Sequence, residues 1–409
     1  MNKIFIYEDE GYKDLLPLVY LRPVFDLYCG MFTFRERIQK LYPRAKICLL
    51  SRFDYPTIQP SDYPTLFING RAVLHSPLPD EEGIFTTGDE IVGFQIPDSR
   101  FQIPDLKLPI KTEFLYSLRK KLKKIKVKAT VIKYPWDLIK ENEFTIIKDF
   151  DVVSQLEVAP TRSKKQDIQI GERTKVEQGV FLKGPIYIGN KVHIKPPSII
   201  EGPCFIGDRT LIDGAKIRPG TTIGKGCRIG GEVEASIFSD YSNKHHEGFV
   251  GHSFIGEWVN LGAGTTTSDL KNTYGTIKVH SPQSTVHSPQ SIIHSKQIDT
   301  RLLKLGSFIG DHAKIGIGTL LNAGCVIGCF ANIYGGSMMP EYIPSFTWGT
   351  HEELTEYNFE KALEVAKKVM ARRKVKLTKE DEQRIRSAFE ITQDSSLPTR
   401  SVLGLVRSE

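Results

Sequence analysis

The sequence predicts an α/β domain followed by a parallel β-solenoid and a helical segment at its C-terminal end. Three observations support this fold. Aliphatic residues recur at every sixth position from residue 170 onward, short apolar strands alternate with helical patterns before residue 158, and amphipathic helices follow residue 345. We therefore expect an α/β domain at 1–158, a linker at 159–167, a solenoid at 168–345 and helices at 346–409.

The six-residue period is the strongest signal in the chain. An α-helix has no apolar period of six, and an isolated strand has a period of two, whereas a coil of three short strands points one aliphatic residue per strand into a prism. The period comprises Ile170, Val176, Leu182, Ile188, Ile194, Ile200, Ile206 and Ile212, then Ile223, Ile229, Ile255 and Leu261, then Leu303, Ile309, Ile315, Leu321, Ile327 and Ile333. Two stretches interrupt it, 239–248 and 268–301, and we expect them to be surface loops.

The second interruption contains a seven-residue repeat. His280 and His287 begin two similar segments, and His294 follows the second. Residues seven apart on an extended chain face opposite ways, and Pro282 and Pro289 favour a projecting loop or hairpin over a metal site. The sequence assigns the loop at 280–295 no role.

The first and last parts of the chain follow ordinary patterns. Strands are expected at 3–7, 47–50 and 65–68, and a helix from an N-cap at Thr112 through Ile125. At the other end, Phe359 and Met370 share one face of an amphipathic helix, and Thr378 is placed to cap another. These patterns predict packed helices and strands rather than a site.

The composition is that of an ordinary globular protein, with 40% hydrophobic residues among 409 and a formal net charge of +7. The six cysteines lack C-x-x-C spacing, so we expect reduced thiols rather than a zinc site. The first residues do not resemble a signal peptide and no apolar run could cross a membrane, which predicts a cytoplasmic protein. The spread positive charge suits small phosphate-bearing substrates better than nucleic acid.

Residues 230–275 combine small residues, polar residues and histidines. With the motifs A-K-I-R-P-G at 215–220, H-E-G-F-V-G at 246–251 and V-N-L-G-A-G-T-T-T-S at 259–268, this part resembles the acetyltransferase domain of the bifunctional N-acetylglucosamine-1-phosphate uridylyltransferase / glucosamine-1-phosphate N-acetyltransferase family. The resemblance covers about residues 165–375 and is strongest to a divergent bacterial branch with a short N-terminal domain. It implies a left-handed β-helix of hexapeptide repeats, a homotrimer, and acetyl transfer from acetyl-CoA to an amino-sugar 1-phosphate, with glucosamine 1-phosphate as the first candidate.

The resemblance also assigns roles to individual residues. His246 falls on the family's catalytic base, Arg218 on an arginine that binds the sugar phosphate, and Ala263 on a coenzyme A contact between Gly262 and Gly264. An imidazole titrates near neutral pH and can accept the proton of an attacking amine, and an arginine fork suits a phosphate dianion. Backbone amides of a glycine-rich turn can meet a developing oxyanion.

Two positions depart from the family pattern. The family's Asn-Tyr pair is Asp269-Leu270 here, so an amide donor is replaced by a carboxylate. A phosphate-binding lysine of the family falls in a gap after Glu234, and Lys244 or Lys271 could supply the missing cation. The sequence leaves the choice between them open.

Residues 1–158 resemble a reduced sugar-1-phosphate nucleotidyltransferase. The segment 15–27, which contains Arg22, stands nearest to the family's first loop, and Y-P-W-D-L at 134–138 resembles the P-W-D-L that closes archaeal catalytic domains. Nucleotidyl transfer needs Mg²⁺ held by carboxylates and cations for the leaving pyrophosphate. Asp137 is the expected metal ligand and Arg22 the expected substrate cation.

The metal site is incomplete in the sequence. Asn69 lies where the family has a metal-binding aspartate, so a second carboxylate must come from Asp26 or Asp89. The resemblance implies UTP as the first nucleoside triphosphate to test and dTTP as the second. Two alternatives remain: an acyltransferase with an inactive N-terminal domain, and a nucleotidyltransferase whose solenoid is a trimerisation scaffold.

Overall fold

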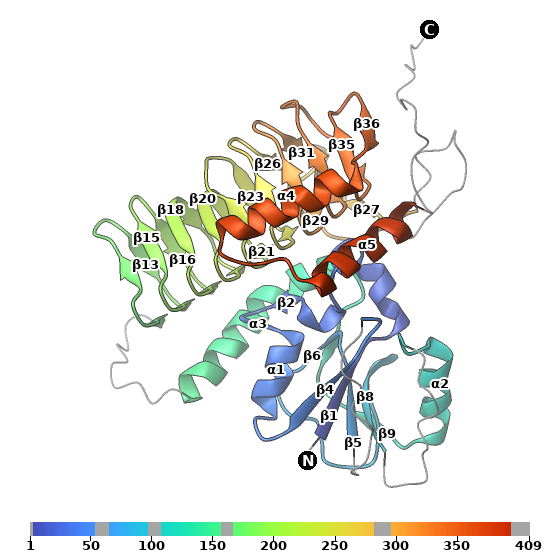
Figure 1. Ribbon diagram of the computed structural model, residues 1–409. Coiled ribbons are helices and arrows are strands. Elements are labelled where there is room, and N and C mark those ends of the chain that lie inside the picture. Colours follow the sequence, from blue (N-terminus) through green and yellow to red (C-terminus); the bar gives the residue numbers. More distant parts are fainter. Residues whose placement is uncertain (1–2, 54–64, 97–107, 157–166, 282–295, 394–409) are drawn as a thin grey trace.

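The computed structural model describes residues 3–53, 65–96, 108–156, 167–281 and 296–393. Figure 1 shows an α/β domain beneath a long parallel β-solenoid, with one C-terminal helix along the solenoid and a second between the two parts. Within these ranges, no helix combines the length and apolarity needed to cross a membrane. The predicted linker, except for Asp167, lies outside the described residues, as do His287 and His294.

The α/β domain is built on a six-stranded mixed sheet. Its strands, in spatial order, are β4 (Lys46–Leu50), β1 (Lys3–Tyr7), β5 (Thr65–Asn69), β8 (Glu90–Ile96), β7 (Gly83–Thr87) and β9 (Lys124–Lys126). β1 runs parallel to β4 and β5, whereas β8 is antiparallel to β5 and β7. Every residue of β1 and β5 is buried, as expected for central strands covered on both faces. These strands include the three that the sequence predicts.

The helix predicted from Thr112 is shorter than expected. α2 covers Thr112–Lys121, with Lys111 at the N-cap position, so Thr112 is the first helical residue. Ile125 belongs to β9, where it is buried between two exposed lysines. That alternation is typical of a strand and ends the helix earlier than its apolar face suggested. The other short elements are β2 (Tyr28–Cys29), β3 (Phe32–Thr33), α1 (Phe34–Leu41), β6 (Ala72–Val73) and β10 (Thr130–Val131).

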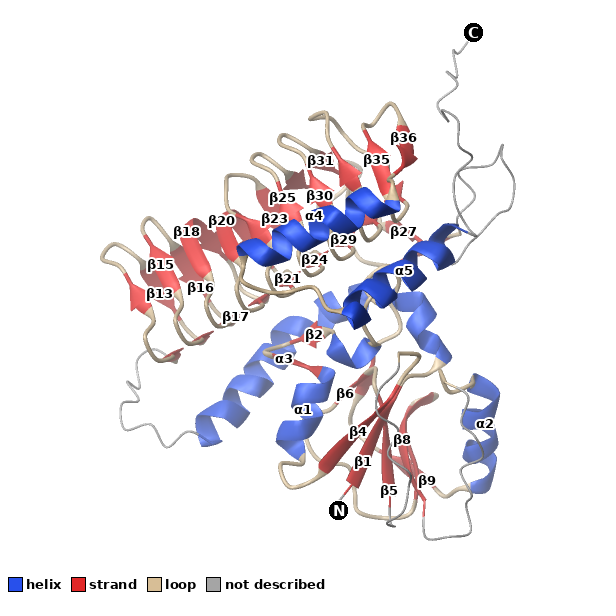
Figure 2. Ribbon diagram, viewed as in Figure 1, coloured by secondary structure: helices blue, strands red, loops and turns tan. Residues whose placement is uncertain are grey.

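The solenoid has three walls of short strands that pair in parallel from coil to coil (Figure 2). The first wall holds nine strands: β11 (Ile168–Ile170), β14 (Ile186–Ile188), β17 (Cys204–Ile206), β19 (Thr221–Ile223), β21 (Ile237–Phe238), β24 (Phe254–Ile255), β29 (Phe308–Ile309), β32 (Val326–Ile327) and β34 (Tyr342–Ile343). The second wall holds β12 (Lys175–Val176), β15 (His193–Lys195), β18 (Leu211–Ile217), β20 (Arg228–Glu234), β22 (Asn243–Lys244), β25 (Asn260–Leu261), β30 (Lys314–Ile315), β33 (Asn332–Ile333) and β35 (Thr347–Gly349). The third holds β13 (Phe181–Lys183), β16 (Ile199–Glu201), the last residues of β18 and β20, β23 (Phe249–Gly251), β26 (Thr266–Thr267) and β31 (Leu320–Leu321). The predicted parallel β-solenoid is therefore confirmed, and its left-handed winding stays a prediction.

The aliphatic period forms the solenoid core, except in its first coil and at Leu303. Ile188, Ile206 and Ile309 are fully buried, in line with the expected interior positions. Ile170 is 51% exposed because it lies in the first of the described coils, so no described coil packs on that side of it. Leu303 is 55% exposed because it belongs to the excursion that leaves the solenoid after β26.

The first predicted loop, 239–248, is a regular part of the solenoid. β22 lies within it and pairs with β20 and β25. Lys244 takes the interior position that Ile229 holds in the neighbouring coil. Because Lys244 is polar, the apolar period is absent at this coil, and the sequence suggested a loop. The second interruption does leave the coil: β27 (Lys278–His280) and β28 (Gln297–Asp299) form an antiparallel pair around residues 282–295, which lie outside the described ranges.

Helices connect the solenoid to the α/β domain. α3 (Pro135–Leu156) crosses between them, and Asn142 donates hydrogen bonds to the Gly220 carbonyl at 2.8 Å and to Thr222 Oγ1 at 3.1 Å. After β36 (Leu354–Glu356), α4 (Phe359–Arg372) and α5 (Lys379–Gln393) pack on a column of stacked rings that includes Phe330 and Phe346. The two parts of the chain therefore share extensive packed contacts.

Candidate functional site

The third wall of the solenoid carries a row of charged side chains at one edge. Arg218 follows β18, and its Nε donates a hydrogen bond to Glu232 Oε1 at 2.6 Å. The same Nε lies 3.8 Å from Glu234 Oε2, and the other oxygen of Glu234 lies 3.9 Å from Lys304 Nζ. About a third of the Arg218 side chain is exposed, so an anion could reach it.

A histidine and a carboxylate lie in the next coil of this row. His252 Nδ1 is 2.7 Å from Asp269 Oδ2, and the two side chains are only 17% and 14% exposed. Burial alone would raise the pKa of Asp269, but the hydrogen bond from His252 and the charges of His252 and Lys304 hold it below its usual value. Asp269 is therefore an ionised partner for the imidazole.

His246 lies at the opposite end of β23. Its side chain is exposed, and its ring receives no hydrogen bond from the described residues; the nearest aromatic neighbour is His245, with ring centroids 5.1 Å apart. The carbonyl of His246 accepts a hydrogen bond from Lys244 Nζ at 2.6 Å. Lys244 is 1% exposed, and burial lowers its pKa to about 8. Lys244 therefore supports the turn from inside the prism and is not available to bind a phosphate on the surface.

The glycine-rich turn adjoins His246. The amide of Gly264 donates to the Glu247 carbonyl at 2.9 Å and that of Gly262 to the Ile315 carbonyl at 2.9 Å. The amide of Ala263 has no acceptor among the described residues, so it alone of the three can face a ligand. A Cβ at Gly262 would come within 2.6 Å of the Ile317 amide, so the next coil excludes a side chain there.

The predicted solenoid residues thus fall into two groups at the two ends of β23. Arg218 and Asp269 lie at one end, and His246 and the glycine-rich turn lie at the other. Lys271 belongs to neither group, because its Nζ donates to the Thr276 carbonyl within the excursion at 3.0 Å.

Sequence reasoning missed several members of the charged row, among them His252 and Lys304. His252 directly follows the H-E-G-F-V-G motif and offered a signal, since Asp269 replaced an amide and required a new partner. Lys304 gave no signal, because the excursion separates it from Glu234 by 70 residues of chain. It lies beside Glu234, where the family's lysine is missing.

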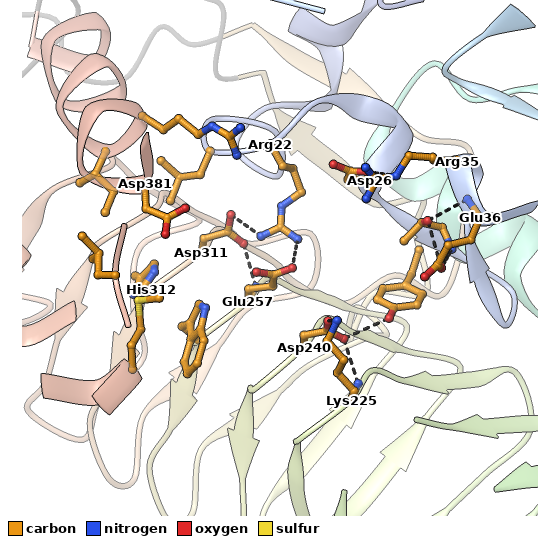
Figure 3. Close-up of a pocket in the computed structure, with 18 residues that line it drawn as sticks. Arg22, Asp26, Arg35, Glu36, Lys225, Asp240, Glu257, Asp311, His312 and Asp381 are labelled. Carbon is orange, nitrogen blue, oxygen red and sulfur yellow. Dashed lines mark hydrogen bonds and ion pairs between the residues drawn. The ribbon is translucent and has the colours of Figure 1, made fainter. Parts of the chain in front are cut away.

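Arg22 of the α/β domain binds the solenoid. Its guanidinium contacts Glu257 Oε1 at 2.8 Å and Asp311 Oδ2 at 2.6 Å (Figure 3). Arg22 is 8% exposed, and although burial alone would lower its pKa, the two carboxylates raise it. Both ends of the guanidinium are occupied by carboxylates, so Arg22 joins the α/β domain to the solenoid, an arrangement that does not favour its expected role in substrate binding.

The expected metal ligands of the α/β domain are also engaged. Asp137 Oδ2 accepts the backbone amides of Lys133 and Tyr134, both at 3.0 Å, and so caps the start of α3. Asn69 donates to Asp9 Oδ2 at 2.9 Å, and Asp9 in turn pairs with Arg71 at 2.7 Å. In the described ranges, no group of three or more histidine, cysteine or acidic side chains could hold a metal ion. These residues do not fit the Mg²⁺ site that the resemblance implied.

A cavity of about 250 Å³ lies between the α/β domain, the solenoid and α5, and residues of all three line it. Figure 3 shows charged side chains from all three parts around it. Lys225 Nζ lies 3.0 Å from Asp240 Oδ2, and Arg35 Nε lies 3.0 Å from Asp26 Oδ1. The two candidates for the second metal carboxylate lie apart: Asp26 is part of this interdomain cluster, whereas Asp89 pairs with Arg119 at 3.0 Å on the surface.

Known proteins match both parts of this architecture. Residues 4–157 match the model of the sugar nucleotidyl transferase family. A bifunctional sugar-1-phosphate nucleotidylyltransferase/acetyltransferase of Sulfurisphaera tokodaii is 34% identical over 125 residues, which cover 30% of this chain and 28% of that protein. The bifunctional protein GlmU of Synechococcus sp. (strain CC9902) is 28% identical over 149 residues, or 36% of this chain and 27% of that protein. The matched stretches thus span little more than a quarter of these relatives.

Among solved structures, a mutant of AntD, an N-acyltransferase from Bacillus cereus in complex with dTDP and coenzyme A, aligns with 50% of this chain and 91% of its own. The identity is 17% and the TM-score 0.22, values too low to carry a conclusion about this chain. From the sequence matches, residues 4–157 form a nucleotidyltransferase-like domain, and parts of the chain are similar to bifunctional sugar-1-phosphate nucleotidylyltransferase/acetyltransferases.

Proposed function

We propose that this chain is a bifunctional transferase of nucleotide-sugar synthesis. In this proposal the solenoid transfers the acetyl group of acetyl-CoA to the amine of an amino-sugar 1-phosphate, and glucosamine 1-phosphate is the first acceptor to test. The α/β domain transfers a nucleotidyl group from UTP, or from dTTP, to the sugar 1-phosphate. The activities named for the relatives support this assignment. Because these substrates are cytoplasmic metabolites, the proposal places the chain in the cytoplasm.

The acetyl transfer rests on one observation, the pairing of a charged row and a glycine-rich turn at the two ends of β23. Arg218 and Lys304 offer cations for a phosphate, and the exposed amide of Ala263 offers a donor to the thioester. His246, exposed beside the turn, is the proposed acceptor of the amine proton. The amine nitrogen then bonds to the acetyl carbon, the carbon–sulfur bond breaks, and coenzyme A leaves as the thiol.

Nucleotidyl transfer rests on the family match of residues 4–157. The contacts of Arg22 and Asp137 favour a second candidate, an acyltransferase whose α/β domain has lost catalysis, because both residues serve structural contacts. If the domain is active, its metal ligands and substrate cations are other residues than these.

Pyrophosphate release separates the two candidates. The full-length chain is supplied with N-acetylglucosamine 1-phosphate, Mg²⁺ and UTP or dTTP, and pyrophosphate is measured. We expect release if the α/β domain is catalytic. No release with any common triphosphate across several sugar phosphates would leave acyl transfer as the chain's activity.

Acetyl-CoA binding tests the solenoid site in the same preparation. A ligand at a hundred times its dissociation constant stabilises the folded chain by about 2.7 kcal/mol, which raises the melting temperature. Thiol release from acetyl-CoA in the presence of glucosamine 1-phosphate then measures the transfer itself. Absence of both effects would favour the remaining alternative, a solenoid that serves as a trimerisation scaffold.

An exposed apolar patch beside the glycine-rich turn supports the proposed homotrimer. Ile317 is 73% exposed, and Leu320, Tyr334 and Met338 are between 40% and 47% exposed. Such a patch on a parallel solenoid is a suitable contact for a second copy. Light scattering should give the mass of three chains, and Ile317→Asp should lower it. A monomeric wild-type chain at working concentration would contradict the proposal.

A further inference from the structure

The charged row contains an imidazole that the proposed reaction does not use. His252 lies at a corner where the backbone enters the left-handed region, with φ of +46°. The preceding coils place Gly220 and Ala235 at this corner, with φ of +76° and +44°, so small residues satisfy the turn there. The amide of His252 donates to the Glu234 carbonyl at 2.9 Å, which stacks it on the coil before. The turn itself therefore does not require a histidine.

Asp269 fixes the orientation of this ring. With Oδ2 of the ionised carboxylate 2.7 Å from Nδ1, the proton of the neutral imidazole lies on Nδ1 and Nε2 becomes an acceptor. Nε2 has no hydrogen-bond partner among the described residues. It is also absent from their buried atoms that lack a partner, so it is accessible to solvent. A hydrogen-bond donor from outside the chain can therefore reach it.

The surroundings of Nε2 indicate the chemistry of that donor. Asp269 pairs with His252, and the charge of Lys304 acts on Asp269. Lys304 lies 3.9 Å from Glu234, which leads on to Arg218. The two cations suit a phosphate, and the imidazole suits a hydroxyl or an amine close to it. A sugar phosphate presents both groups on one small molecule.

We propose that His252, oriented by Asp269, is a specificity-determining residue that accepts a hydrogen bond from a hydroxyl or amine of the sugar 1-phosphate acceptor. This inference rests on the proposed acetyl transfer. His246 accepts the proton in that reaction, whereas His252 binds the acceptor. The two histidines therefore affect different kinetic constants.

The test is acetyl-transfer kinetics of the full-length chain with glucosamine 1-phosphate as the varied substrate. His252→Ala matches the residue that the preceding coil carries at this corner, and it should raise KM for the acceptor about tenfold, more than it lowers kcat. His193→Ala is the matched control, since His193 Nε2 lies 2.6 Å from Glu177 Oε1 in an early coil outside the site. The control should leave KM unchanged.

The split between KM and kcat supplies a readout that a structural role would not move. Asp269→Asn loses the carboxylate that orients the ring, so it should raise the acceptor KM in the same direction as His252→Ala. Melting curves of each variant verify folding.

The outcomes separate this inference from the proposed function. An active wild-type chain whose His252→Ala and His193→Ala variants share the wild-type KM would overturn the inference alone. A His252→Ala variant that loses kcat with unchanged KM would also overturn it, in favour of proton transfer. A wild-type chain that acetylates no amino-sugar phosphate would overturn both proposals.

Discussion

The contact between Arg22 and the solenoid should contribute strongly to stability. The guanidinium bridges Glu257 and Asp311 at 2.8 and 2.6 Å, and the Arg22, Glu257 and Asp311 side chains are 10%, 33% and 3% exposed. Removing one partner from a buried ion pair leaves uncompensated charge and costs about 3–5 kcal/mol. We therefore expect Arg22→Met to lower the free energy of unfolding by about this amount, measured by urea denaturation with circular dichroism and tryptophan fluorescence.

Arg35→Met is the matched control for this variant. Arg35 also pairs with a carboxylate near the cavity, Asp26 at 3.0 Å, but its side chain is 42% exposed. Exposed ion pairs contribute up to about 1 kcal/mol, so the control should lose much less. Equal small losses in both variants would refute the view that Arg22 holds the two parts of the chain together.

The penalty of Arg22→Met should also depend on pH. Burial raises the pKa of Glu257 to about 7 despite the attraction of Arg22, and the variant lacks that attraction. A carboxyl whose folded pKa is raised contributes stability below its ordinary pKa and loses it as the pH rises through the folded value. Wild type therefore ionises Glu257 near pH 7, whereas the variant does so only at higher pH. The penalty should be constant below about pH 7 and grow as the pH rises above it, and a penalty that does not grow above pH 7 would contradict this account.

Three further predictions concern single residues. His246→Ala should lower kcat for acetyl transfer about 10²-fold without preventing the acetyl-CoA thermal shift; an unchanged rate at saturating substrates would reject its role as the base. The lowered pKa of Lys244, about 8, implies that stability rises between about pH 8 and 10.5, where only the unfolded chain still holds that proton. Urea titrations of Lys244→Met should lack this rise, and the same rise in the variant would exclude Lys244 as its source. Asp137→Ala should cost about 1 kcal/mol through loss of the α3 cap, and it should not affect pyrophosphate release if any is found.

Local patterns in the sequence were sufficient for the architecture. The six-residue period predicts a solenoid because every coil buries one aliphatic residue per wall, a demand that each segment meets by itself. The same reasoning wrongly predicted a loop at 239–248, because the interior position there is held by the polar residue Lys244. Its buried ammonium group donates a hydrogen bond to the His246 carbonyl in place of water. The motif resemblance pointed to Arg218 and Asp269, and the structure places both at the same end of β23.

Only the tertiary structure decided what the charged residues do. Arg22 meets carboxylates that lie more than 230 residues away, and it joins the two parts of the chain because those partners engage both ends of the guanidinium. Lys304 reaches Glu234 across the excursion, and His252 meets Asp269 one coil later. Apolar burial depends on a residue's own segment, whereas an ion pair depends on which distant segment lies beside it. The sequence therefore determined the coils, and their stacking determined the site.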